Sequence, residues 1–201
     1  MQANVHAKAM MNGDEAGAGW YADERAVRAN WKAPPGCLTT EQLAARSGLE
    51  TLRAMIAGDL PRPPITEALD FLLVHAEHGR VVFQGAPAHR HYNPMGIVHG
   101  GWFATLLDSA VGCAVHSILP PGKGYTSLEL KVNFVRALSA EVPRVRAEGV
   151  VVHAGRQIVT AEGRLSDANG RLYAHATTTC LVFDQRASGP QTQATATSAA
   201  A

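Results

Sequence analysis

The sequence predicts an α+β fold in which one long helix lies on an antiparallel sheet. Four segments rich in β-forming residues, 125–136, 142–153, 156–167 and 171–183, follow one another with short connections. They are preceded by the apolar residues 101–118, which favour a helix of about five turns. Two further β-rich segments lie ahead of this helix. The predicted order is therefore two strands, one helix and four strands.

Alternation and turn signals support the individual strands. In 125–136, apolar and polar residues alternate, which predicts one buried and one solvated face. The segments HAGR (153–156) and DANG (167–170) are predicted hairpin turns, and the Asn-Gly pair of the second favours a type I′ turn. His78 and Gly79 make the turn of the hairpin ahead of the helix.

Length and composition fit one domain with flanking segments. A chain of 201 residues with 46% apolar residues can bury one core. Residues 1–38, rich in Ala and Gly without a sustained period, are predicted to form a flexible arm, and 39–66 a helical extension that packs on the core. The main domain covers 67–184. Residues 185–201 have almost no large apolar side chains and are predicted to be disordered.

The extension has one competing interpretation. It opens with a capping box formed by Thr39 and Gln42, and its first half resembles the start of a helix-turn-helix. No basic recognition helix follows, and prolines at 61, 63 and 64 arrive too soon. A helix that packs on the core is therefore the preferred interpretation.

Charge and cysteine content exclude several classes of function. Eighteen basic and 17 acidic residues give a formal net charge of +1, which supplies no broad basic surface for nucleic acid or an anionic membrane. No apolar run approaches the roughly 20 residues that span a bilayer. The three cysteines are far apart, which argues against disulfides or a zinc site. We expect a cytoplasmic protein that binds a small molecule or another copy of itself.

The long helix contains one acid, Asp108, in apolar surroundings. Its neighbours three and four positions away include no cation, and mid-helix it gains nothing from the helix dipole. We therefore expect a buried carboxylate that serves as a general base with a raised pKa. The structural alternative is that an arginine or backbone group from elsewhere binds it and fixes the packing.

The turn VHGG before the helix offers a second chemical group. Its free backbone N–H groups lie at the positive end of the helix, where they can stabilise a carbonyl oxygen that gains negative charge. His99 and Asp108 are separated by nine residues, about 13 Å along the axis, and lie on opposite faces. One chain cannot bring both to one small substrate. Two antiparallel copies of the helix across a two-fold axis can, so the chemistry requires a dimer.

At these residues the chain resembles the hotdog-fold acyl-CoA thioesterases of the phenylacetate-degradation type, within the 4-hydroxybenzoyl-CoA thioesterase superfamily. The resemblance covers residues 69–183, through NPMGIVHGGWFATLLDSA, SLELKVNFVRAL and GRQIVTAEGRLSDANGRLYAHATTTCLVF. It implies a central helix wrapped by an antiparallel sheet of about six strands. It also implies a homodimer, expected to assemble into a tetramer, with active sites at the interface. The substrate is then an aryl or medium-chain acyl-CoA, and no separate cofactor is needed.

The resemblance also assigns roles to five residues. Asp108 would activate the attacking water or, as the less favoured alternative, attack the thioester itself, while the Gly100 N–H would polarise the carbonyl. Asn93 would place the water or carbonyl, or else only cap its turn. His99 would orient the turn and the thioester, or make a structural hydrogen bond. Ser127 matches a position that assists the water in some relatives.

Other candidates are weaker. His89, His91 and His99 imitate a metal site, but no carboxylate or cysteine completes the set, so no metal is expected. Cys113 has no adjacent base and is expected to be a core residue. The acyl pocket is expected along Trp102, Phe103 and Leu106, with the extension over 49–66 as its roof. Contacts to CoA phosphates remain open among the following strand residues: Lys131, Arg136, Arg144, Arg146 and Arg156.

Two alternative functions remain at this point. A hydratase of the same fold would add water to an unsaturated acyl-CoA, but these enzymes pair an acid with a nearby histidine. The only such candidate, His116, lies more than two turns beyond Asp108. A non-catalytic module would bind acyl-CoA without hydrolysis. No G-x-S-x-G motif suggests a serine hydrolase.

Overall fold

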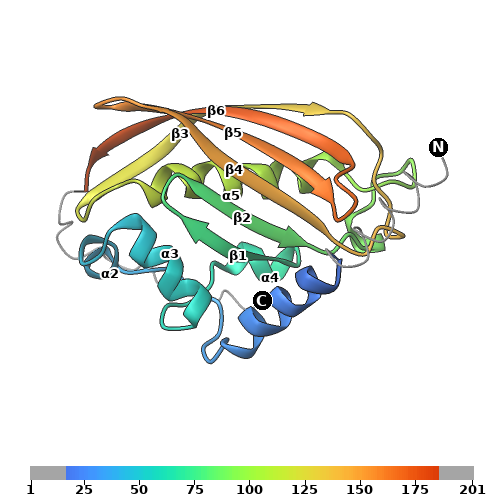
Figure 1. Ribbon diagram of the computed structural model, residues 1–201, viewed down its shortest axis with the longest axis horizontal. Helices are drawn as coiled ribbons and strands as arrows, with labels where there is room; N and C mark the ends of the chain where they lie inside the picture. The colour runs from blue at the N-terminus through green and yellow to red at the C-terminus, as the bar shows by residue number, and fades with distance from the viewer. Residues whose placement is uncertain (1–16, 186–201) are drawn as a thin grey trace, which may run out of the picture.

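The computed structural model describes residues 17–185, so residues 1–16 of the predicted arm and nearly all of the predicted tail lie outside it. The described chain has the predicted α+β order: two strands, one long helix and four strands. All pairings are antiparallel, and the six strands lie in the order β1-β2-β4-β5-β6-β3 (Figure 1). The strands are β1 (Phe71–Glu77), β2 (Arg80–Gly85), β3 (Lys123–Phe134), β4 (Val145–Ala154), β5 (Ile158–Asp167) and β6 (Leu172–Asp184).

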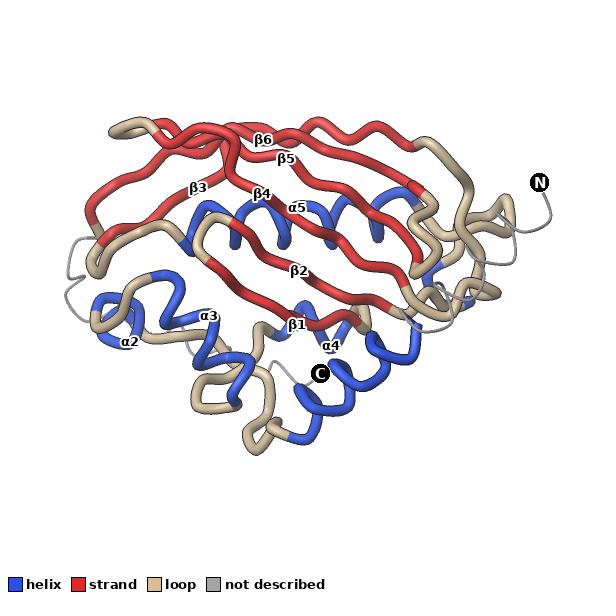
Figure 2. The backbone as a smooth tube through the Cα atoms, viewed as in Figure 1, coloured by secondary structure: helices blue, strands red, loops and turns tan. Residues whose placement is uncertain are grey.

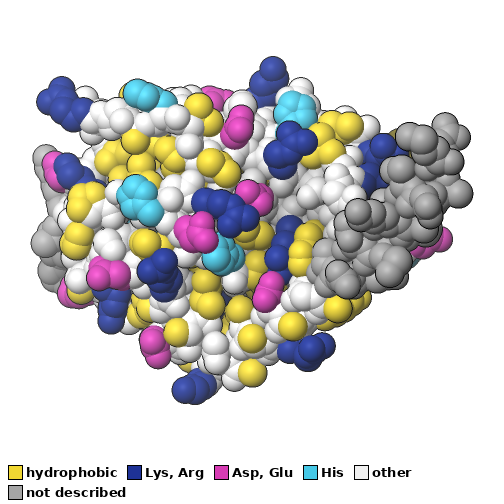
Figure 3. Space-filling model, viewed as in Figure 1, with side chains coloured by type: hydrophobic (Ala, Val, Ile, Leu, Met, Phe, Trp, Pro, Cys, Tyr) yellow, Lys and Arg dark blue, Asp and Glu magenta, His cyan; other side chains and the backbone are white. Residues whose placement is uncertain are grey.

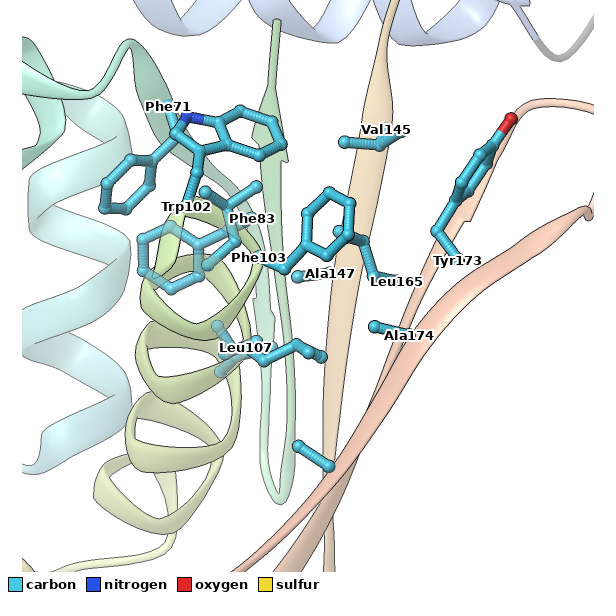
Figure 4. Packing of buried hydrophobic residues seen from close by; sticks show 14 of the residues in the cluster. Phe71, Phe83, Trp102, Phe103, Leu107, Val145, Ala147, Leu165, Tyr173 and Ala174 are labelled. Atoms are coloured by element: carbon cyan, nitrogen blue, oxygen red, sulfur yellow. The ribbon is translucent and has the colours of Figure 1, made fainter. Parts of the chain in front are cut away.

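The long helix α5 (Gly100–Ser117) lies against one face of this sheet, mainly under β4, β2 and β5 (Figure 2). Leu106, Leu107 and Val111 are completely buried between helix and strands. Figure 4 shows Phe103 and Leu107 of α5 on the side of the strands that carry Ala147 and Leu165. Burying each large apolar side chain contributes about 1.5–3 kcal/mol, so this contact is the main source of stability.

The first half of α5 is not wrapped on all sides. Gly101 and Asp108 are exposed in the single chain, and Ala104 and Thr105 between them are half-buried. These positions recur every three or four residues and therefore form one stripe along the helix that the chain leaves partly uncovered. The expectation that Asp108 is buried is wrong for the isolated chain, because the sheet does not cover this stripe fully.

One turn differs from the prediction. The Gly170 N–H donates to the Asp167 carbonyl at 2.9 Å, and Gly170 has a φ of 75°. Asn169 does not have a positive φ, which a type I′ turn requires. The Asp167 N–H donates to the Arg171 carbonyl at 3.2 Å, so the hairpin loop contains three residues instead of two. The register of β5 and β6 also shifts between Leu165 and Ser166.

Three short helices form the predicted extension beside the β1 edge: α2 (Thr40–Ala44), α3 (Gly48–Ala57) and α4 (Pro64–Ala68). The Thr39 capping box is present, and a second one joins Ser47 and Glu50. Helix α3 packs on β1 and α5. Pro64 begins α4, because proline is well accommodated at the first helical position, where no N–H is needed.

Part of the predicted arm is also helical. Residues 17–29 form a helix that lies beside the sheet, with Val27 buried. Glu24 of this helix is only 7% exposed and accepts hydrogen bonds from Arg28 and Arg144. Gln84 of β2 donates to the same carboxylate at 3.1 Å. Ion pairs with the sheet thus hold a segment that lacks an obvious apolar period.

Candidate functional site

The N-terminus of α5 presents a free backbone donor. His99 is the N-cap, and its Nδ1 accepts a hydrogen bond of 2.8 Å from the Gly101 N–H. The Trp102 N–H donates to the His99 carbonyl. The Gly100 N–H has no acceptor among residues 17–185. A donor at the positive end of a helix is suited to bind an oxygen with negative charge.

Glycine at 100 also keeps this point accessible. A Cβ there would lie 3.0 Å from the Phe134 ring, so a side chain would displace Phe134 or the turn. An open pocket of about 320 Å³ lies in front of Gly100, with Asn93, Phe103, Phe134 and Arg136 in its lining. A substrate carbonyl can therefore approach the Gly100 N–H from solvent.

Asn93 holds the turn that shapes this pocket. Its Oδ1 accepts hydrogen bonds from the N–H groups of Met95 (3.0 Å) and Ile97 (3.4 Å). The Asn93 N–H donates to the Ile97 carbonyl at 2.8 Å. The capping role is therefore present in the structure. Its Nδ2 has no acceptor among the described residues and remains able to donate to a ligand.

Asp108 lies two turns further along α5 and has a different neighbour. The Ser127 hydroxyl of β3 faces the Asp108 carboxylate as a hydrogen-bond donor. Removal of water by the surrounding chain raises the pKa of Asp108, although the Ser127 hydrogen bond partly opposes this. No Lys, Arg or His within residues 17–185 forms an ion pair with Asp108. The structural alternative of an arginine partner is absent from this part of the chain.

The five candidate residues therefore form two groups. Asn93, His99 and Gly100 surround the pocket at the helix N-terminus, whereas Asp108 and Ser127 face each other elsewhere. Eight residues separate Gly100 from Asp108, which is about 12 Å along a helix. One chain does not bring the Asp108 carboxylate and the Gly100 N–H to the same point.

The other sequence candidates are the histidines considered as metal ligands and the basic residues considered as phosphate ligands. His91 stacks on Trp102, and no three His, Cys, Asp or Glu side chains within residues 17–185 are placed to hold a metal. Arg144 and Arg146 form ion pairs with Glu24 and Asp23 of the N-terminal helix. Within the described chain, three of the candidate phosphate ligands have no ion pair: Lys131, Arg136 and Arg156. Of these, Arg136 lines the pocket at Gly100.

The expected acyl pocket along Trp102 and Leu106 is not found. Both side chains are buried in the core, and the Trp102 Nε1–H donates to the Leu69 carbonyl. Phe103 alone of the three lines an open pocket. A different cavity, beside the C-terminal half of α5, is lined by Cys113, His116 and Tyr125. Tyr125 is not among the sequence candidates, because an aromatic residue in a strand is typical of ordinary core packing.

Surface features carry few further signals. Basic and acidic side chains are interspersed on the face shown in Figure 3, as the net charge of +1 leads one to expect. Among residues 17–185, no helix is long and apolar enough to cross a membrane. Neither feature identifies a ligand.

Comparisons with known proteins do identify a family. A family model described as thioesterase superfamily matches residues 95–174. The match includes Gly100, Asp108 and Ser127, but begins after Asn93. No curated protein matches the chain.

Solved structures with the same fold include three bacterial proteins. A phenylacetic acid degradation-related protein from Ralstonia eutropha JMP134 is 26% identical, with 65% of this chain and 98% of that chain aligned and a TM-score of 0.59. The TT0310 protein of Thermus thermophilus is 30% identical, with 60% and 97% aligned and a TM-score of 0.54. A variant of the phenylacetic acid degradation protein PaaI from the same organism is 29% identical, with 59% and 97% aligned and a TM-score of 0.53. At least a third of this chain has no counterpart in them.

Proposed function

Because the chain belongs to the thioesterase superfamily and has the hotdog fold, we propose that it is an enzyme that hydrolyses an acyl-CoA thioester to a free acid and CoA. The acyl group is an aryl or medium-chain one. One observation carries the proposal: the carboxylate of Asp108 and the free N–H of Gly100 have complementary roles but lie at different points of one helix.

A homodimer brings these groups together. The unpaired edge strand β3 carries exposed Leu128 and Phe134, and a long apolar edge of this kind favours pairing with a second copy. Pairing of two β3 edges across a two-fold axis extends the sheet and places two α5 helices side by side. Asp108 of one subunit then faces Gly100 of the other, at two equivalent sites. Assembly of two dimers into a tetramer belongs to the same proposal.

In the proposed reaction Asp108 removes a proton from water as the water oxygen attacks the thioester carbonyl carbon. The carbonyl oxygen becomes negative and accepts the hydrogen bond of Gly100. When the C–S bond breaks, its electron pair stays on sulfur, and the CoA thiolate takes the proton held by Asp108. A thioester is reactive enough that these two groups suffice, without a metal or a cofactor.

The remaining residues position the reactants. Ser127 holds the Asp108 carboxylate, and the Asn93 amide donates to the water or carbonyl. His99 fixes the turn through its bond to the Gly101 N–H, which agrees with a positioning role. All three cysteines, Cys37, Cys113 and Cys180, are free, which supports our proposal of a cytoplasmic location.

Thiol release from a panel of acyl-CoAs tests this function. Asp108→Asn is expected to lower kcat by about 10²–10⁴-fold, the usual contribution of a general base, with little change in KM. The variant should fold normally. Its melting temperature at pH 7 should equal or exceed that of the wild type, because ionising a carboxyl whose pKa is raised costs folding free energy. Unchanged turnover would exclude Asp108 as the base, and water addition without thiol release would indicate a hydratase.

A further inference from the structure

A cavity of about 250 Å³ lies between the N-terminal extension and the C-terminal half of α5. We call it the extension cavity. Leu52 and Met55 of α3 line one side, Cys113 and His116 of α5 another, and Tyr125 of β3 a third. Most of its wall is apolar. Its volume lies just below the roughly 300–1,000 Å³ of sites that enclose drug-sized ligands, so it suits a small apolar group.

Helix α3 is firmly seated over this cavity. The Gly48 N–H donates to the Leu119 carbonyl at 3.0 Å. A Cβ at Gly48 would lie 1.7 Å from the His116 carbonyl oxygen, so only glycine permits this approach of α3 to α5. Helix α3 is therefore held in a defined position on α5, and the cavity between them has a defined wall.

Three buried polar atoms at the cavity wall have no hydrogen-bond partner among residues 17–185. They are Arg62 Nε, His116 Nδ1 and Gln185 Oε1, and all three residues line the cavity. Burial also lowers the pKa of His116, so its ring is neutral at pH 7. Buried polar groups are normally satisfied. Water or an oxygen atom of a bound molecule would satisfy these three.

The cavity is aligned with the proposed base. Asp108, Gly112 and His116 are four residues apart and so share one side of α5. Tyr125 packs across the middle of this line, where a Cβ at Gly112 would lie 2.9 Å from the Tyr125 hydroxyl. Ser127, which faces Asp108, is two residues from Tyr125 on the same strand. Asp108 and the cavity thus lie along the same side of α5, with the Tyr125 ring packed closely on Gly112 between them.

We propose that the extension cavity holds the hydrocarbon part of the acyl group, and that α3 sets how long that group can be. This inference rests on the proposed thioesterase function. For a thioester at Asp108 to extend its acyl chain into the cavity, the Tyr125 ring must turn away from Gly112, on which it packs closely. The C-terminal residues 186–201 are poor occupants, because they contain no Val, Ile, Leu, Met or aromatic side chain.

The test changes one side chain in the cavity wall. Met55→Trp fills the cavity and should lower kcat/KM for octanoyl-CoA at least about tenfold, while acetyl-CoA turnover stays within about twofold. Met55→Ala enlarges the cavity and should shift the preference toward longer chains. Ile65→Trp is the matched control, because Ile65 is 48% exposed on α4 and does not line the cavity. Circular dichroism and melting temperature verify that each variant folds.

A second measurement separates this inference from the proposed function. Octanoate alone should raise the melting temperature of wild type, Asp108→Asn and Ile65→Trp, but not that of Met55→Trp. If acyl-CoAs are hydrolysed and both Met55 variants keep the wild-type chain-length profile, the cavity assignment is overturned and the function stands. If no acyl-CoA is hydrolysed but octanoate binding depends on Met55, the function fails and the cavity assignment stands.

Discussion

Ser127 of β3 and Asp108 of α5 face each other across the edge of the sheet, with the serine hydroxyl as donor to the carboxylate. Partial removal of water by the surrounding chain raises the pKa of Asp108, and this hydrogen bond restrains the increase. The Ser127 oxygen also lies 3.9 Å from the buried Cys180 sulfur, which limits the orientations it adopts. The pair joins the central helix to the strand that is free to meet a second subunit.

Removing the serine hydroxyl should change the pH dependence of catalysis. In Ser127→Ala the restraint is lost, so the pKa of Asp108 rises further. A general base must be ionised, and the acidic limb of the kcat/KM profile should therefore move to higher pH, with activity retained on the alkaline side. Thr126→Ala, an exposed neighbour on the other face of β3, is the control. An acidic limb at the wild-type position would contradict a role for Ser127 in tuning the acid.

Mixing two inactive variants tests whether the site is shared between subunits. Asp108→Asn lacks the base, and Gly100→Val should lose the oxyanion donor because its side chain meets Phe134. In a random mixture half of the dimers contain both variants, and each has one intact site, so about a quarter of wild-type activity should return. Activity is measured after co-expression or joint refolding.

If each site lies within one chain, the same mixture gives the opposite result. Every subunit would then carry a defect in its own site, and no activity would return. A double variant with both changes in one chain, mixed with wild type, controls for nonspecific stabilisation. It should recover no more than the wild-type fraction predicts.

The anchor of the N-terminal helix makes a prediction about stability. Burial raises the pKa of Glu24, but hydrogen bonds and charges from Arg144 and Arg28 outweigh it, and the pKa is lowered. Glu24→Gln should reduce the free energy of unfolding at pH 7 by about 1–3 kcal/mol, measured by urea denaturation. Asp23→Asn, which breaks a more exposed pair with Arg146, should cost about 0–1 kcal/mol.

The pH dependence of this difference follows from the sign of the shift. A carboxyl with a lowered folded pKa contributes stability above its unfolded pKa, about 4.3, and loses it as the pH falls through the folded value. The stability difference between wild type and Glu24→Gln should therefore shrink in acid. If the difference stays constant to below about pH 3, Glu24 stabilises the fold through its packing and not through its negative charge.

The sequence predicts the core of the fold well because local patterns there agree with the tertiary contacts. The four β-rich segments and the apolar run before Asp108 are confirmed by β3 to β6 and α5. The predicted buried face of 125–136 is wrong in part, because Leu128 and Phe134 are exposed on β3, an edge strand of the sheet. The helix over 17–29 escapes detection because its anchors, Glu24 to Arg144 above all, are ion pairs between residues far apart in the chain. Such partners have no signal in a local window.

The sequence predicts which residues belong to the candidate site, but not how exposed they are. An acid without a local partner is visible in the sequence, and the structure contains no ion pair to it among residues 17–185. Its exposure is not visible, because that depends on which side of α5 the sheet covers. The sequence predicts a pocket beneath the extension but not its lining, because Met55, Cys113 and Tyr125 come from three separate elements.

The contact of Gly48 with the His116 carbonyl links the region that the family model covers to a region outside it. The family model covers 95–174, which includes α5 but not α3. A bulkier residue at 48 would lift one from the other, so a change in an appended surface helix would be felt at the centre of the domain. Exposed positions of α3, such as Arg53, are free of that constraint and can change without displacing the central helix.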